Sequence, residues 1–107
     1  MPITLQNPLD DLIQAALAAY PDMDCVVRFG SLDGDGLAVT IWPDDGGRPE
    51  ITIRPDVPLE GVLELLAHEI AHVAAGLEAG HGEAWKSAFA AIHAAYENRV
   101  APEHEQQ

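Results

Sequence analysis

The sequence predicts an α+β fold with a small three-stranded antiparallel sheet, an N-terminal helix and two further helices. Two stretches, residues 9–20 and 85–96, place apolar residues at helical spacing. A third, residues 58–75, is long and apolar but carries the motif His-Glu-x-x-His. Three short runs rich in β-branched and aromatic residues predict the strands at 25–29, 37–42 and 50–54. We expect residues 1–107 to form one domain with flexible ends at 1–6 and 101–107.

The N-terminal helix and the strands follow from local signals. Asn7 is the expected cap, Pro8 fits the first turn, and Pro21 stops the helix. Residues 31–36 contain Gly and Asp and predict a hairpin between the first two strands. Asp33 and Asp35 resemble the start of a calcium loop, but no Glu stands at the twelfth position, so a turn is expected.

The last two helices are expected at residues 58–75, with Asp56 as cap, and at 82–99. On the second, Trp85, Phe89, Ile92 and Tyr96 form an apolar stripe that is expected to pack against the sheet and the preceding helix. His93 and Tyr96 are candidates for stabilising an oxyanion, but each lies several turns beyond His81 and is interpreted as an exposed or core-edge residue. His104 lies in the polar end and is a poor ligand candidate.

The acidic charge restricts the class of partner. Eighteen acidic residues stand against five basic ones, for a formal net charge of −13. Because nucleic-acid affinity comes largely from cations that contact phosphates, a nucleic-acid partner is disfavoured. A basic protein or peptide is favoured instead. The interpretation that the charge serves solubility alone stays open.

Composition also bears on the compartment. The single cysteine, Cys25, cannot form an internal disulfide, which favours a reducing compartment. The first residues show neither a basic n-region nor a long apolar run, and no stretch approaches the roughly 20 residues that span a bilayer. These features predict a cytoplasmic protein without a membrane segment, and they leave the oligomeric state undetermined.

The stretch from His68 to His81 predicts a metal site. Residues four apart share one helix face, so His68 and His72 can bind one ion, and Glu69 can lean over it and accept a proton from water. Without a metal, these polar groups would be costly on so apolar a helix. Catalytic zinc needs a third protein ligand. A helix end near Gly76 would let the chain turn and return His81, the preferred candidate.

The pattern HExxH, eight residues, then HGxxW resembles the SprT-like zinc metallopeptidases over residues 68–85. This resemblance implies a minimal zincin-like protease core that binds Zn²⁺ through His68, His72 and His81, with Glu69 as general base. In zincin-type peptidases an edge strand beside the cleft commonly pairs with the substrate backbone. The cysteine-rich zinc ribbon of many relatives is not found here. Some relatives act on proteins attached to DNA, a role that the acidic charge disfavours.

The functional hypothesis is a zinc-dependent endopeptidase that uses a metal-activated water. A variant replaces His81 by Glu83 or Glu78 as third ligand, as in gluzincins, but the spacing of His81 and the glycine after it fit the resemblance better. The alternative from another class is a catalytically silent, metal-stabilised binding module for a basic protein partner. Hydrolysis of a non-peptide amide is a third possibility, since the motif does not encode the substrate.

Overall fold

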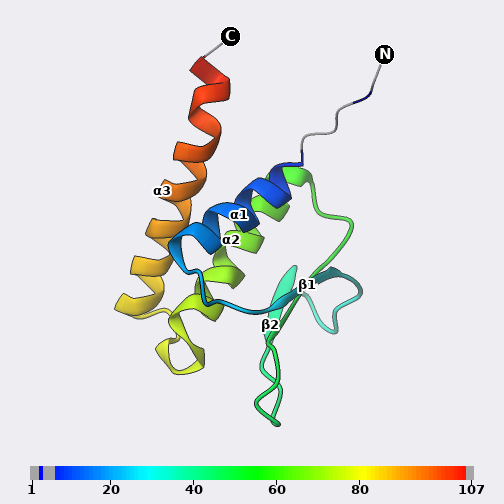
Figure 1. Ribbon diagram of the computed structural model, residues 1–107. Coiled ribbons are helices and arrows are strands. Elements are labelled where there is room, and N and C mark those ends of the chain that lie inside the picture. The colour runs from blue at the N-terminus through cyan, green and yellow to red at the C-terminus, as the bar shows by residue number, and fades with distance from the viewer. Residues whose placement is uncertain (1–2, 4–6, 106–107) are drawn as a thin grey trace.

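The computed structural model describes Ile3 and residues 7–105 (Figure 1). Its elements in chain order are α1 (Pro8–Ala19), β1 (Val26–Phe29), β2 (Ala38–Ile41), β3 (Glu50–Ile53), α2 (Leu59–Ala75), the 3₁₀ turn η1 (Leu77–Ala79) and α3 (Glu83–Glu105). The α+β class and the order of these elements agree with the sequence-based prediction, and each predicted strand is found within one residue at either end.

The sheet is mixed, and the prediction of a fully antiparallel sheet is wrong. The strand order is β1-β3-β2, with β1 parallel and β2 antiparallel to β3. The connection after β1 therefore makes no hairpin with β2 but crosses the end of β3. Two backbone hydrogen bonds fix this crossing, from Gly30 N to Ile53 O at 3.0 Å and from Arg54 N to Leu37 O at 3.0 Å.

The central place of β3 has a physical reason. Ile51 and Ile53 are fully buried and Thr52 is 5% exposed, so this strand is covered on both faces. A central position between two neighbouring strands buries more of a strand's apolar side chains. The strand with the most such side chains therefore gains the most stabilisation there, because burial removes apolar surface from water. β1 and β2 then become the two edges of the sheet.

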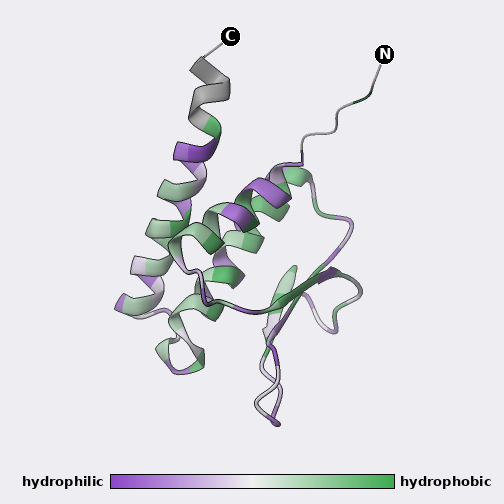
Figure 2. Ribbon diagram, viewed as in Figure 1, coloured by the Kyte–Doolittle hydropathy of each residue, from purple (hydrophilic) through white to green (hydrophobic). Residues whose placement is uncertain are grey.

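Helix α2 is the central element of the fold. It packs against β2 and β3 on one side and against α1 and α3 on the other, and α1 and α3 also contact each other. The expectation that the C-terminal helix packs against the sheet is wrong, because α2 lies between them (Figure 1). Figure 2 shows that α2 is hydrophobic over much of its length, as a helix covered on several sides must be.

The helix ends agree with the sequence in part. Asn7 caps α1 by accepting a hydrogen bond from Leu9 N at 3.0 Å, as predicted. Asp56 does not cap α2: the cap position belongs to Pro58, and the Asp56 carboxylate lies 3.5 Å from Arg54 Nε. An ion pair with the neighbouring strand end thus replaces the expected cap.

The C-terminal helix is longer than expected. The backbone of α3 stays helical to Glu105, past the predicted end near Arg99. Of the predicted flexible ends, residues 1–2, 4–6 and 106–107 lie outside the described part of the chain.

Candidate metal centre

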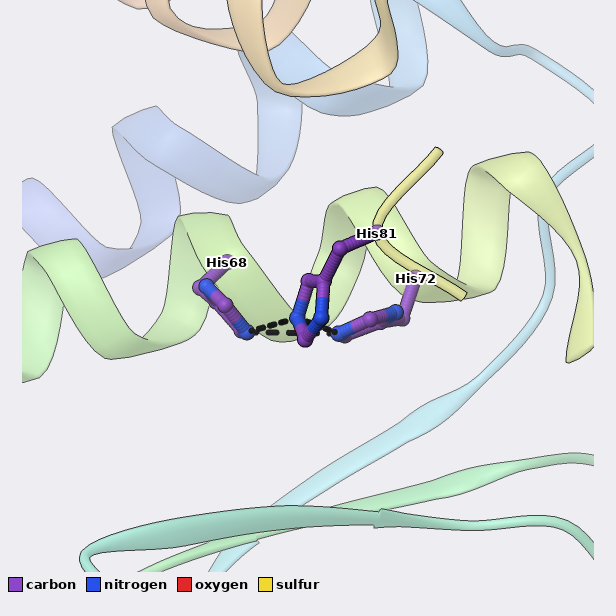
Figure 3. Close-up of side chains that lie close together, drawn as sticks. All are labelled: His68, His72 and His81. Carbon is purple, nitrogen blue, oxygen red and sulfur yellow. Dashed lines mark hydrogen bonds between the residues drawn. The ribbon is translucent and has the colours of Figure 1, made fainter. Parts of the chain in front are cut away.

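Two of the three site histidines are positioned by helix geometry alone. His68 and His72 lie four residues apart on α2, so both imidazoles leave the same face of the helix (Figure 3). The helix then ends at Gly76, whose φ of 97° favours glycine and whose N–H donates to His72 O at 2.9 Å. The η1 turn and Gly80, with φ 54°, reverse the chain and return His81 to the same face.

The three side chains meet at their Nε2 atoms. The Nε2–Nε2 distance is 3.2 Å between His68 and His72, 3.1 Å between His72 and His81, and 3.2 Å between His81 and His68 (Figure 3). A neutral imidazole nitrogen is either a donor or an acceptor. Three mutually close nitrogens therefore cannot make three hydrogen bonds at once. In at least one pair, both Nε2 atoms must present a lone pair or both must carry a hydrogen.

A metal ion removes this conflict, because all three lone pairs can point at one centre. Nitrogens that bind one ion tetrahedrally at about 2.0–2.1 Å lie about 3.3–3.4 Å apart, which is about 0.1–0.3 Å more than the distances found. The three histidines could thus hold a metal ion, and they form the one such group of His, Cys, Asp or Glu among the described residues. Burial and the neighbouring His68 and His81 lower the pKa of His72, which keeps it in the neutral, ligating form.

Trp85, on the first turn of α3, lies against all three histidines. Its ring centroid is 4.9 Å from that of His68, 5.6 Å from His72 and 4.9 Å from His81. Its Nε1–H donates to the backbone oxygen of His68 at 3.2 Å, and its other side stacks on Phe89 at 5.0 Å. The tryptophan of the sequence motif therefore links α3 to the cluster and limits the rotation of the three rings.

Glu69 is buried next to the cluster, with 8% of its surface exposed. Its carboxylate accepts a hydrogen bond from Thr40 Oγ1, on β2, at 3.2 Å. Burial raises the pKa of Glu69, while His68, the Thr40 hydrogen bond and His81 act in the opposite direction. A carboxylate in this setting can take up a proton and release it again.

A pocket of about 450 Å³ opens beside His68 and Glu69. Its remaining walls come from β2, α2 and α3 and are formed by Leu37, Ala38, Glu64, Leu65 and Phe89. β2 is therefore the edge strand at the candidate site, a point that the sequence left open.

Other candidates lie elsewhere. Glu78 and Glu83 are exposed and do not join the histidine group, so neither is placed as third ligand. His93 and Tyr96 line a separate pocket between α2 and α3. Asp33 and Asp35 lie in the exposed crossover after β1 and are not part of a metal-ligand group in the residues described.

Sequence reasoning missed Thr40 and the pocket walls. Strand alternation places Ala38 and Thr40 on one face of β2, but it does not say which helix that face meets. The only signal in the sequence for the role of Thr40 was a threonine at an inward-facing position of the strand.

Comparison with known proteins does not assign a family. No family model matches the chain, and no curated protein and no solved structure is similar to it. The fold and the site define an α+β protein with a three-histidine cluster that could hold a metal ion and an adjacent buried carboxylate. Within the described residues, no helix combines the length and apolar character that crossing a membrane requires.

Proposed function

We propose that this protein is a zinc-dependent endopeptidase with His68, His72 and His81 as metal ligands and Glu69 as general base. The observation that carries the proposal is the convergence of three Nε2 atoms within 3.1–3.2 Å beside a buried glutamate. Three imidazoles without a fourth protein ligand are typical of catalytic zinc, whereas structural zinc has four. When bound, zinc would lower the pKa of a water molecule and polarise the carbonyl of the scissile bond.

In this proposal Glu69 moves the proton. Its carboxylate takes a proton from the attacking water and passes it to the nitrogen of the departing amine. A pKa raised by burial supports this role, because a general base works best when its pKa is near the working pH. Thr40 donates a hydrogen bond to one carboxylate oxygen, Oε2, so Oε1 would be the oxygen that takes up the proton.

The edge strand supplies a binding mode for the substrate backbone. β2 pairs only with β3 among the described strands, so its other side offers backbone groups beside Glu69. By its resemblance to zincin-type peptidases, we propose that an extended peptide adds to β2 as a further strand. Its side chains would then alternate toward and away from the pocket.

The test compares zinc-loaded wild type with Glu69→Gln on an unstructured protein such as reduced casein, with product masses read out. Glu69→Gln should keep its zinc, measured by elemental analysis, and lose activity by about 10²–10⁴-fold, as expected for a general base. His72→Ala should lose both zinc and activity. Glu83→Gln is the matched control and should keep both.

The outcomes distinguish the proposed mechanism from its alternatives. An active Glu69→Gln protein would contradict the assigned base. Loss of zinc in Glu83→Gln, with retention in His81→Ala, would favour the acidic third ligand. A wild type that binds zinc and cuts nothing would favour the metal-stabilised binding module.

A further inference from the structure

The pocket beside the histidine cluster combines apolar walls with three polar residues, His68, Glu69 and Glu64. Leu37, just before β2, Leu65 of α2 and Phe89 of α3 provide aliphatic and aromatic walls, and Leu37 is 48% exposed. Glu64 is the carboxylate of this lining that has no part in the proposed proton transfer. A ligand side chain that fills such a pocket needs a long apolar stem and a polar tip.

Glu64 lies close to the chemistry proposed for the site. It precedes His68 by four residues on α2, so it sits one turn away on the ligand-bearing face, about 5–6 Å between Cβ atoms. Its side chain is 67% exposed, and its carboxylate lies 3.7 Å from His93 Nε2 on α3. The carboxylate is therefore open to solvent, and Glu64 lines the same pocket as His68 and Glu69.

In the described part of the chain no lysine or arginine pairs with Glu64, whose partner is His93 when that imidazole is protonated. All five basic residues pair with other acids: Arg28 with Glu50, Arg48 with Asp24, Arg54 with Asp56, Lys86 with Glu83 and Arg99 with Asp11. The adjoining pocket of about 360 Å³ shares Glu64 and adds Glu60 and Glu97. Negative charge therefore extends from the candidate metal centre along the groove between α2 and α3.

We propose that this pocket selects a lysine or arginine side chain of the substrate, with Glu64 as the specificity-determining residue. The aliphatic stem would lie against Leu37, Leu65 and Phe89, and the cationic head would pair with Glu64. The inference rests on the proposed endopeptidase site for the position of the substrate. It narrows the substrate class from basic proteins in general to a basic residue beside the cleaved bond.

The test measures binding separately from cleavage. Zinc-loaded Glu69→Gln protein is titrated with fluorescent alanine- and serine-based peptides that differ at one position, which holds lysine, arginine, norleucine or glutamate. Norleucine keeps the stem and removes the charge. Because Glu64 is partly exposed, we expect lysine and arginine to bind about fivefold more tightly than norleucine, and glutamate to bind most weakly.

The control variants separate Glu64 from the overall charge. Adding Glu64→Gln should abolish the preference for lysine over norleucine, and Glu64→Lys should favour the glutamate peptide. Asp44→Asn removes the same single charge from the exposed turn before β3 and should leave the preference unchanged.

The outcomes distinguish this inference from the proposed activity. Equal binding of lysine and norleucine, a preference that survives Glu64→Gln, or no measurable peptide binding would overturn it. So would cleavage by wild type at sites without neighbouring basic residues. A Glu64-dependent preference in a wild type that cleaves nothing would uphold the pocket and reject the endopeptidase.

Discussion

At the residue scale, the site depends on the carboxylate of Glu69, which the fold buries. Glu69 has one hydrogen-bond donor in Thr40 and lies among apolar neighbours on α2. An ionised carboxylate is costly in such a place unless a positive charge is near. A bound metal would supply that charge, so the metal-free protein should carry an electrostatic penalty at this residue.

This penalty predicts how stability depends on pH in the presence of a chelator. Burial raises the pKa of Glu69 in the folded state above its ordinary value of 4.5, so the folded protein binds this proton more tightly than the unfolded chain. The resulting stabilisation is present below that ordinary value and is lost as the pH rises through the raised pKa. As the pH rises to neutral, Glu69→Gln should therefore lose less unfolding free energy than wild type does, as measured by urea denaturation.

The control for this prediction is Glu78→Gln, which changes an exposed carboxylate on η1. It should follow the pH profile of the wild type. If Glu69→Gln also followed it, the burial of Glu69 would not be the cause.

At the element scale, the candidate site depends on three elements that meet at α2. α2 carries two histidines and the glutamate, the turn after it carries the third histidine, and β2 supplies Thr40. α3 brings Trp85 against the cluster, and its Ala88 and Ile92 join the buried core. The packing of α3 on α2 therefore fixes the rings that surround the cluster.

The Trp85 contacts predict a specific effect on metal affinity. Trp85→Phe keeps an aromatic ring on Phe89 but removes the donor to His68 O. Residues that support metal ligands typically contribute 10–100-fold to affinity, so zinc affinity should fall by about tenfold, measured by competition with a chelating dye. Trp42→Phe is the matched control because Trp42 lines a different pocket, and it should leave affinity unchanged. Equal affinities for wild type and Trp85→Phe would contradict the positioning role.

At the scale of the whole molecule, metal binding at the three histidines would be coupled to folding. The three histidines come from a helix and from the turn that follows it, and they converge only in the folded chain. An ion that binds the folded state alone raises stability by RT ln(1 + [L]/Kd), about 2.7 kcal/mol at a hundredfold excess over Kd.

We therefore expect the melting temperature to rise with free zinc and to fall on addition of a chelator, as measured by calorimetry. His72→Ala should remove this dependence. His93→Gln, which changes a histidine outside the cluster, should retain it. Zinc dependence that persisted in His72→Ala would place the ion elsewhere.

The local sequence determined much of the site. The spacing of His68 and His72 fixes both on one helix face, and Gly76 and Gly80 mark the turn that returns His81. The ends of α1, the three strands and the start and end of α2 also agree with prediction to within about one residue. These features depend on neighbours within a few residues, which is why periodicity and capping reveal them.

Only the tertiary structure decided which elements meet. Strand alternation identifies the faces of a strand but not its neighbours, so the order β1-β3-β2 and the parallel pairing of β1 with β3 were not predictable. The Thr40 hydrogen bond to Glu69 and the place of Glu64 in the pocket depend on that order, because it sets β2 beside α2. The sequence therefore determined which side chains are available for chemistry, and long-range packing of the core decided which of them lie together.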